Sequence, residues 1–384
     1  MAAGAAFTAQ QADLSRLTQA SRRRSLSGRG GADFSSNDYL GLAASSELAG
    51  AVRAALERGV PVGSGGSRLL RGNHAEHEAL ESEAATLFGC ERALYFSSGF
   101  AANSALLSTL PQRGDLIVHD ELIHASAHEG MRLGRAEHLA VRHNDASAFE
   151  LAVQGWRKRG NTGRVWLAIE SLYSMDGDCA PLDDLAAIAA RHDAVLLIDE
   201  AHATGVFGPE GRGLAAHLDG QPNVITLRTC GKALGCEGAL ICAPTAVADF
   251  LINRGRGFIF STAPSPLMAA AVREALRLLK SAPERRDMLW QQVRLAEQVL
   301  GPLGAKVNGS QILPLIIGED GATMARAADL QQAGFDVRGI RPPTVPPGTG
   351  RLRIAITLNV SEAEITGLGE AMRAVSVHSA AQGS

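Results

Sequence analysis

The feature that most constrains the fold is a series of short, almost wholly apolar stretches, each followed by a stretch with helical spacing. These stretches lie at 93–96, 115–118, 164–170, 195–199, 224–228 and 239–242. They have the length of strands and are too short to span a membrane. Strands that are apolar on both faces are typical of a mostly parallel sheet with helices on both sides. The sequence therefore predicts an α/β fold.

The pattern changes after about residue 275. Apolar residues recur at helical spacing over 284–303, which predicts a long helix. Residues 351–358 alternate strictly, which predicts a strand with Arg353 on the face opposite its leucines and isoleucines. We expect a smaller α+β domain here, completed by the N-terminal segment. The expected divisions are 1–44 for that segment, 45–275 for the large domain and 276–384 for the small one.

Composition limits the function classes. The net charge of −3 gives no basic surface for nucleic acid. The five cysteines contain no Cys-x-x-Cys pair, which argues against a disulfide framework or a structural zinc site. We therefore expect no metal, and a reducing cytoplasmic location without a membrane span. The first thirty residues are rich in Arg and Ser, as in a transit peptide, but the spacing of Leu14, Leu17 and Ala20 favours a helix.

Two of the expected strands end in groups that point to one cofactor. Asp199 ends the stretch 195–199, and Lys232 follows 224–228 between Gly231 and Gly235. Ligands of such sheets bind at the carboxyl ends of the strands. A lysine is more often a solvated charge, but small apolar neighbours favour burial and a lowered pKa. Pyridoxal phosphate (PLP) needs a lysine for its Schiff base and an acid for its ring nitrogen, so we predict a PLP site.

Other residues could complete such a site. Ser98, Gly99 and Phe100 follow a strand and open a helix, where free N–H groups bind anions such as phosphate. His124 and His128 could be ordinary histidines or a metal pair, although no third ligand is evident. A third alternative is that the flat ring of His124 stacks on a planar cofactor. Arg353 could be exposed to solvent or bind a carboxylate in bidentate fashion.

Together these motifs resemble the α-oxoamine synthases, a family of PLP fold type I. The matching stretches are FSSNDYLGL at 34–42, GSGGSRLL at 63–70, SSGFAAN at 97–103, SMDGDCAPL at 174–182, DEAHATGVFGPEGRG at 199–213, TCGKALG at 229–235 and FIFSTAPSP at 258–266. The resemblance covers about 34–360, nearly the whole chain.

The resemblance implies a role for each matching residue around the cofactor. Lys232 would form the Schiff base, Asp199 would pair with the ring nitrogen, and His124 would stack on the ring. His202 and Ser174 would approach the phenolic oxygen of the ring. The phosphate-binding residues implied are Ser98, Gly99, Phe100, Thr229 and, from the neighbouring subunit, Thr262. That last position implies a homodimer with its active site at the interface.

The resemblance also implies the substrates. Arg353 and Asn37 would hold the amino-acid carboxylate, and Thr344 would belong to the substrate-binding loop. Arg22 would meet a carboxylate at the far end of the acyl chain. The stretch RPPTVPPGTGRLR at 341–353 is a narrower match. It is similar to the biotin-pathway member of the family, which joins L-alanine to a pimeloyl thioester carried by CoA or a carrier protein.

Two rival functions are weaker. Other members of the family use glycine, as 2-amino-3-ketobutyrate ligase and 5-aminolevulinate synthase do, but the 341–353 stretch counts against them. A non-catalytic PLP-binding regulator would need a DNA-binding module, for which we expect no room before Phe34. The chain departs from the family pattern in its short segment before Phe34, at Arg71 and His74, and at Glu237. None of these changes removes a catalytic group, and the first two bear on the shape of the acyl-chain entry.

Overall fold

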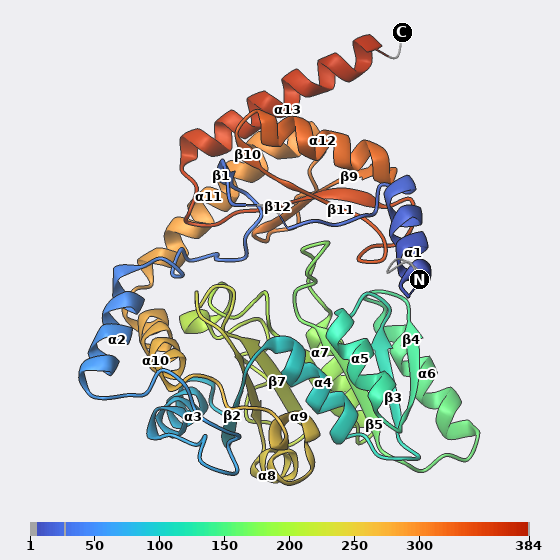
Figure 1. Cartoon of the computed structure of the whole chain (residues 1–384). Coiled ribbons are helices and arrows are strands. Elements are labelled where there is room, and N and C mark those ends of the chain that lie inside the picture. The colour runs from blue at the N-terminus through green and yellow to red at the C-terminus, as the bar shows by residue number, and fades with distance from the viewer. Residues whose placement is uncertain (1–5, 27, 383–384) are drawn as a thin grey trace. The chain divides into compact units, whose positions relative to one another are not determined.

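The structure, a computed structural model, describes residues 6–26 and 28–382, with side chains up to Val375 (Figure 1). It divides into two compact units. The larger unit holds residues 37–174 and 178–287, and the smaller unit holds the other described residues. The units divide after residues 36 and 287, whereas we expected divisions after 44 and 275. The second boundary differs because helix α10 (Pro266–Ser281) packs on α2 (Ser46–Glu57) and α3 (Ala75–Phe88) and so belongs to the larger unit.

A seven-stranded sheet forms the centre of the larger unit, in the order β2-β8-β7-β6-β5-β3-β4. Only the pairings of β8 are antiparallel, so the prediction of a mostly parallel α/β sheet is confirmed. The strands are β2 (Arg92–Phe96), β3 (Leu116–Asp120), β4 (Glu137–Val141), β5 (Val165–Glu170), β6 (Val195–Asp199), β7 (Val224–Thr229) and β8 (Ala239–Ala243). The sequence reading missed β4, because this edge strand is largely exposed and lacks a continuous apolar run.

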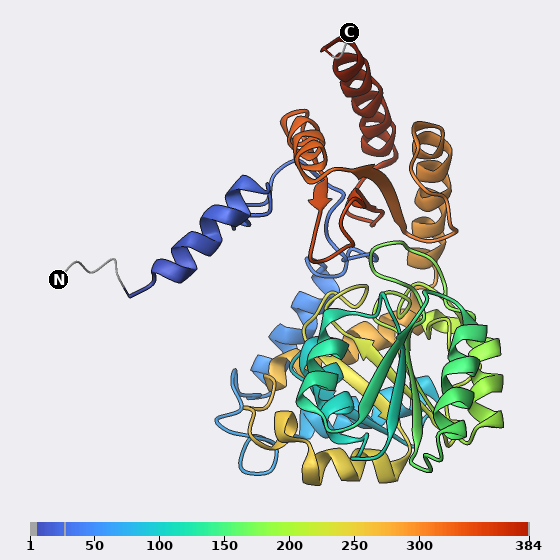
Figure 2. The same ribbon diagram turned by 90° about the vertical axis from the view of Figure 1, so that its right-hand side faces the viewer.

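Helices cover both faces of this sheet (Figure 2). Alternate residues of one strand serve the two faces: Ile117 packs in one core, and Leu116 and Val118 pack in the other. The helices that pack in the first core are α4 (Gly99–Thr109), α5 (Ala125–Leu133), α8 (Thr245–Arg254) and α9 (Arg256–Ile259). The second core contains residues of α6 (Ala146–Lys158) and α7 (Leu182–Arg191). A 3₁₀ turn, η1, covers Pro209–Gly211.

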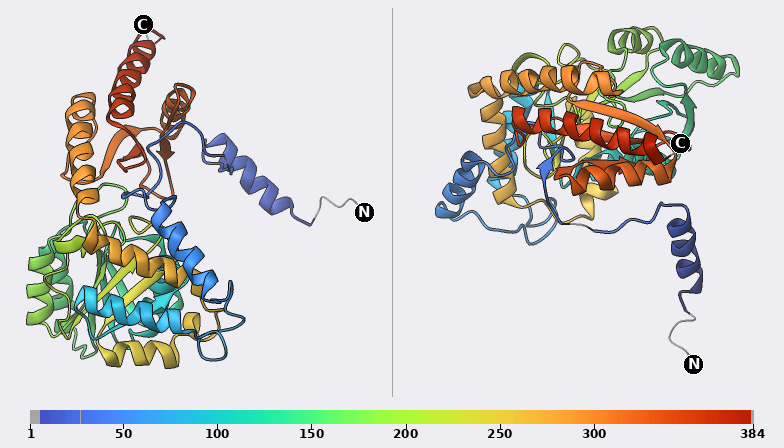
Figure 3. Two further views of the ribbon diagram at one scale, coloured as in Figure 1. Left: turned by 90° about the vertical axis from the view of Figure 1, so that its left-hand side faces the viewer. Right: turned by 90° about the horizontal axis from the view of Figure 1, so that it is seen from above.

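Three more helices complete the larger unit, with α10 lying beside both α2 and α3 (Figure 3, left). They are α2 (Ser46–Glu57), α3 (Ala75–Phe88) and α10 (Pro266–Ser281). The Ser45 side chain caps α2 by accepting the Leu48 N–H at 3.3 Å. On this helix Ala55 is buried and its neighbour Leu56 is exposed.

The smaller unit contains a three-stranded antiparallel sheet in the order β11-β12-β9. Its strands are β9 (Ile312–Gly318), β11 (Arg338–Ile340) and β12 (Gly350–Ala355). A separate parallel pair joins β1 (Ala32–Asp33) to β10 (Phe335–Asp336). Through this pair, residues 32–33 of the N-terminal segment join the smaller unit. In this part of the chain, only the two residues before Phe34 pair in a ladder.

In the smaller unit, α12 and α13 lie side by side (Figure 3, right). The helices are α1 (Thr8–Gln19), α11 (Glu284–Leu300), which begins in the larger unit, α12 (Asp320–Gln332) and α13 (Glu362–Gln382), with a 3₁₀ turn η2 (Gly301–Leu303). A capping box opens α13, since the Ser361 N–H donates to Glu364 Oε2 at 2.7 Å and the Glu364 N–H donates to Ser361 Oγ at 3.3 Å. Throughout the described residues, no helix has the length and apolar composition that a bilayer crossing requires.

A half-buried histidine, His143, joins two strand-end loops of the larger unit. His143 Nδ1 lies 3.0 Å from Asp120 Oδ1, and His143 Nε2 lies 2.8 Å from Asp178 Oδ2. Burial opposes the charged imidazolium, but the hydrogen bonds to both carboxylates outweigh it and raise the pKa of His143 to about 10. Since Asp120 ends β3 and Asp178 follows β5, the imidazolium fixes loops at the carboxyl edge of the sheet.

Replacing His143 with Gln should lower the melting temperature by about 2–4 °C near pH 6. The pKa of folded His143 lies above its usual 6.5. Its stabilisation is therefore complete below pH 6.5 and is lost as the pH rises through about 10. The difference between wild type and variant should shrink over that range in calorimetry. His217→Gln is the matched control, because the His217–Asp183 pair is exposed. A difference that grows with pH would contradict the prediction.

Candidate active site

A pocket of about 350 Å³ opens where β5, β6 and β7 end in the larger unit. Ligands of open α/β sheets bind at this edge. The structure brings nine of the predicted site residues together around it: Asn37, Ser98, Gly99, Phe100, His124, Asp199, His202, Thr229 and Lys232. Among the other residues that line it, Asn103, Ser126 and Glu170 bear on the geometry described below and were not predicted.

Asp199, the last residue of β6, is a buried carboxylate with both oxygens hydrogen-bonded. Its Oδ2 accepts from Asn103 Nδ2 at 2.7 Å, and its Oδ1 accepts from the Ala201 N–H at 2.9 Å. Hydrogen bonds that a carboxylate accepts favour its ionised form. Asp199 can therefore hold a negative charge in the pocket.

His124 is linked to the same carboxylate through two side chains. Asn103 Nδ2 also donates to Ser126 Oγ at 3.0 Å, and Ser126 Oγ lies 2.8 Å from His124 Nδ1. The Ser126 N–H donates to His124 Nδ1 as well, at 3.2 Å. Because Nδ1 accepts, the proton of His124 must reside on Nε2. Burial also lowers the pKa of His124, aided by Lys232 and opposed by Asp199, so the ring is neutral.

Lys232 lies close to the anion-binding end of α4. Its Nζ donates to Thr229 Oγ1 at 3.3 Å. A Cβ on Gly99 would lie 2.5 Å from Thr229 Cγ2, so only glycine lets α4 come this close to the end of β7. The first turn of a helix leaves its N–H groups without intrahelical acceptors. Those of Gly99 and Phe100 therefore suit an anion beside Lys232.

His202 is oriented by a hydroxyl from the start of the larger unit. Its Nδ1 lies 2.7 Å from Tyr39 Oη, and Tyr39 donates its hydroxyl proton to Asn37 Oδ1 at 3.0 Å. Since that proton is engaged, His202 Nδ1 must carry a hydrogen and donate to Tyr39. Asn37 thus contributes to the pocket by fixing His202 through Tyr39.

Ser174 is buried near this pocket, and its N–H donates to Glu170 Oε2 at 3.1 Å. Thr262 is an exposed residue of the larger unit that does not line the pocket. The other predicted substrate residues, Arg22, Thr344 and Arg353, belong to the smaller unit. Their roles stay predictions.

Within the smaller unit, Arg22 is engaged in an ion pair and Arg353 is buried. Arg22 Nε forms an ion pair with Asp320 Oδ2 at 2.6 Å. Arg24, in the same run, donates to Thr344 Oγ1 at 3.2 Å. Arg353 is only 5% exposed, because β12 is buried on both faces. The alternative of a solvent-exposed Arg353 is therefore wrong.

Of the three site residues that were not predicted from the sequence, only one had a recognisable sequence signal. Glu170 ends β5 just as Asp199 ends β6, so its strand-end position was a usable signal. Asn103 and Ser126 lie inside helices among small residues, where nothing in the sequence distinguishes them from ordinary polar positions. The residues whose side chains are described hold no cluster of three or more metal-binding side chains, so a His124–His128 metal pair finds no support.

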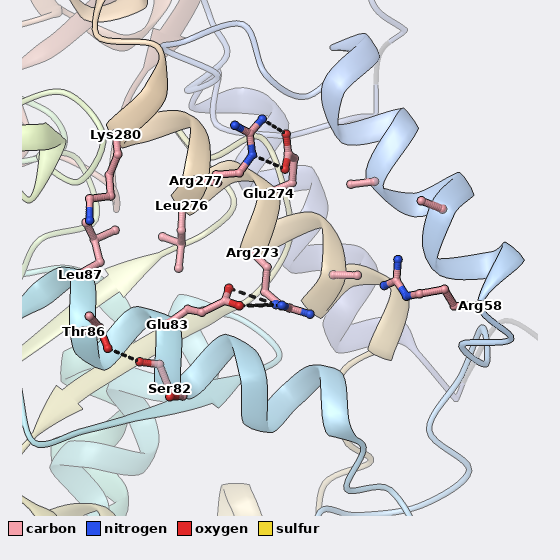
Figure 4. A pocket seen from close by; sticks show the side chains of 13 residues that line it. Arg58, Ser82, Glu83, Thr86, Leu87, Arg273, Glu274, Leu276, Arg277 and Lys280 are labelled. Carbon is pink, nitrogen blue, oxygen red and sulfur yellow. Dashed lines mark hydrogen bonds and ion pairs between the residues drawn. The ribbon is translucent and has the colours of Figure 1, made fainter.

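A second cavity, of about 600 Å³, lies among α2, α3 and α10 (Figure 4). Three arginines line it, and each is paired with a glutamate. Arg58 pairs with Glu76 and Arg277 with Glu274, and Arg273 reaches both Glu76 and Glu83. These charges are neutralised within the groove. We therefore take the Lys232 pocket as the candidate active site.

Replacing Asn103 with Ala should lower the free energy of unfolding by about 1–3 kcal/mol, because Asp199 Oδ2 would lose its donor in a buried site. Denaturant unfolding of the purified protein measures this loss. Ser104→Ala is the matched control on the same helix, since the Ser104 hydroxyl makes only a long contact of 3.4 Å with the Ser126 carbonyl. Equal stability of the two variants would show that the Asn103–Asp199 bond contributes nothing.

Comparison with known proteins agrees with this geometry. Residues 30–372 match the family aminotransferase class I and II. An 8-amino-7-oxononanoate synthase of Methylobacterium nodulans is 42% identical over 345 residues, which cover 90% of this chain and 87% of the relative.

Solved structures resemble the chain over nearly its whole length. A serine palmitoyltransferase (SPT) structure with a PLP internal aldimine has a TM-score of 0.87 at 26% identity, covering 98% of this chain and 100% of that one. An 8-amino-7-oxononanoate synthase of Francisella tularensis has a TM-score of 0.76 at 27% identity, covering 91% and 98%. The chain belongs to the class I and II aminotransferase family and, within it, to the 8-amino-7-oxononanoate synthases.

Proposed function

We propose that the chain condenses L-alanine with a pimeloyl thioester, on CoA or a carrier protein, in biotin biosynthesis. The products are 8-amino-7-oxononanoate, CO2 and the free thiol. The observation that supports this most is 42% identity, across 90% of the chain, to a relative named for that product. We also propose a cytoplasmic location, which suits the five free cysteines.

The pocket fits PLP, the cofactor of this family. Lys232 supplies an amine beside an anion-binding helix end, and Asp199 supplies a carboxylate with two hydrogen-bond donors of its own. Glycine at position 99 leaves space between α4 and Thr229 that a Cβ would fill. Lys232, Asp199, His124, His202, Ser174 and Thr229 would hold the cofactor, with the first turn of α4 at its phosphate. When bound, PLP accepts the electron pair left on the alanine Cα.

The residues of the chain would then act as follows. Lys232 Nζ removes the proton from the alanine Cα, as general base. The Asp199 carboxylate holds a proton on the ring nitrogen, where positive charge favours electron withdrawal. Neutral His124 presents a flat, uncharged ring, so it adds no positive charge that would oppose the proton on the ring nitrogen. Gly99 and Phe100 bind the phosphate through their N–H groups.

Substrate choice would rest on the smaller unit. We propose that Arg353, with Asn37 of the larger unit, holds the alanine carboxylate, and that Thr344 contacts the acyl substrate. For the far carboxylate of the pimeloyl chain, Arg22 remains our proposal. Its ion pair with Asp320 would have to open or be shared, since one guanidinium can serve two carboxylates.

The two kinds of structural neighbour differ in what they support. The SPT structure superposes better than the Francisella tularensis synthase, with TM-scores of 0.87 and 0.76. Both are about equally distant in sequence, at 26% and 27% identity. Superposition reports the shared fold, which hosts several activities. The 42% identity to a synthase therefore weighs more for the substrate.

Lys232→Ala should abolish turnover, with a loss of at least about a thousandfold, because both the amine that binds the cofactor and the general base are removed. The absorbance of the cofactor joined to Lys232 should disappear as well. Steady-state assays and visible spectra measure the two effects. Lys280→Ala, an exposed lysine of the other groove, should keep both. Turnover by Lys232→Ala at the wild-type rate would disprove the proposed mechanism.

The substrate proposal is tested by measuring thiol release with a matrix of acyl-CoA and amino-acid pairs. We expect release with pimeloyl-CoA and L-alanine to exceed every other pair by about tenfold or more, since a site built for a carboxylate rejects acyl chains that lack one. Fast release only with acetyl-CoA and glycine would reassign the chain to a different reaction of the family.

We further propose a homodimer in which Thr262 serves the partner's site. The loops around Gly66 and Ala263 are neighbours, since the Ala263 N–H donates to the Gly66 carbonyl at 2.9 Å. They expose large apolar side chains, with Leu70 80% and Phe260 72% exposed. Apolar surface of this kind favours a protein interface.

Mixing two inactive variants tests this arrangement. In a hybrid of Lys232→Ala and Thr262→Arg subunits, one active site would hold both intact residues. Activity should therefore return on mixing, to about half of the wild-type rate per hybrid dimer, because only one of its two sites is complete. Mixing Lys232→Ala with Asp199→Asn is the control. It should restore no activity, because Lys232 and Asp199 line the same pocket of one chain and neither site of the hybrid would hold both. Absence of rescue with Thr262→Arg, while sedimentation shows hybrid dimers, would refute the shared site.

A further inference from the structure

Glu170 is a buried carboxyl group of the pocket that the mechanism above does not use. It is the last residue of β5 and lies in register with Asp199, the last residue of β6. Residues in register on neighbouring parallel strands project to the same side, with their backbones about 4.8 Å apart. Two carboxyl groups therefore end side by side at one pocket.

The two groups have unequal hydrogen-bond partners. Asp199 accepts from Asn103 and from the Ala201 N–H, one donor for each oxygen. Glu170 accepts from the Ser174 N–H through Oε2, and its Oε1 has no partner among the described residues. The residue is only 2% exposed, so water does not compensate for the missing partner.

Two neighbouring carboxylates cannot both ionise cheaply in a buried site. The charged and titratable groups that face Glu170 are Asp199, Lys232, Asp120 and the phenol of Tyr173. Burial first, and then the charge of Asp199, raise the pKa of Glu170 well above its usual 4.5. The Ser174 N–H and Lys232 oppose this shift without reversing it.

We propose that Glu170 is a neutral carboxylic acid that carries its proton on Oε1. It acts as a positioning residue. Its Oε2 holds the Ser174 N–H, and with it the turn that carries Ser174, without placing a second negative charge beside Asp199. The single negative charge of the pair then stays on Asp199, where the proposed function requires it. The inference rests on the proposed function only where it says that the negative charge of Asp199 is needed.

The proposal makes Gln the matched replacement, since Gln is neutral and can still accept the Ser174 N–H. Glu170→Gln should keep the affinity for PLP within about threefold of the wild type, because the hydrogen bond survives. Glu170→Ala should weaken PLP binding by about tenfold or more, because the Ser174 N–H is left buried and unpaired. Titration of the apoprotein with PLP measures both. Equal weakening by the two variants would overturn the proposal.

Stability against pH gives a readout without cofactor. Since the pKa of folded Glu170 is raised, its contribution to stability is complete below pH 4.5 and is lost as the pH rises above it. Glu170→Gln has no such loss. It should gain stability over wild type by about tenfold in the unfolding equilibrium constant per pH unit, until the raised pKa is reached. Glu237→Gln, an exposed carboxyl on the same pocket, should show no trend. A flat difference for Glu170→Gln would show that the acid is ionised.

Infrared spectroscopy tests the wild type directly, and so does not depend on any variant folding. The apoprotein at neutral pH should show the C=O stretch of a protonated carboxylic acid. Labelling glutamate carboxyls alone with ¹³C should shift that band. Absence of a shifted band would refute the neutral acid even if the substrate matrix supports the synthase activity. Since Glu200 is also a buried glutamate with a raised pKa, loss of the shifted band in Glu170→Gln assigns it to Glu170, and that loss together with a failed matrix would leave Glu170 assigned and the substrate wrong.

Discussion

The buried carboxylate of Asp199 is the constraint on which the rest of the pocket depends. Removing a carboxylate from water costs several kcal/mol unless donors replace the lost hydration. Here Asn103 and the Ala201 N–H supply them. Asn103 also binds Ser126, which in turn fixes the neutral tautomer of His124. One amide group therefore sets the charge of the acid and the orientation of the ring at the same time.

Asp199 and the residue after it, Glu200, are both acids, but only Asp199 lies in the pocket. Glu200 is fully buried too, but it faces Arg228, which lies 3.6 Å away and also pairs with Asp219 at 2.7 Å. Burial raises the pKa of Glu200, and Arg228 opposes that rise. Adjacent residues on a strand point to opposite faces. The pair Asp199–Glu200 thus places one acid in the pocket and the other in an internal ion-pair cluster.

More of the fold could be predicted from the sequence than of the hydrogen bonds that support the site. Apolar runs predicted every central strand but β4, whose exposed residues follow no apolar pattern. Strand-end positions predicted Asp199 and Lys232, since topology alone brings such ends to one edge. Asn103 could not be predicted, because its importance arises from a contact with a residue 96 positions away. Hydrogen bonds of this range leave no local pattern.

The division of the chain also explains why its fold says less about the substrate than its sequence does. The groups suited to proton transfer at Cα, such as Lys232 and Asp199, all lie in the larger unit. The residues proposed to choose the acyl substrate, such as Thr344, lie in the smaller unit, on a loop with little regular structure. A loop can change its side chains without altering the sheet that positions the catalytic groups. Enzymes with different acyl substrates can therefore superpose closely, so overall similarity cannot rank them, whereas the loop sequence can.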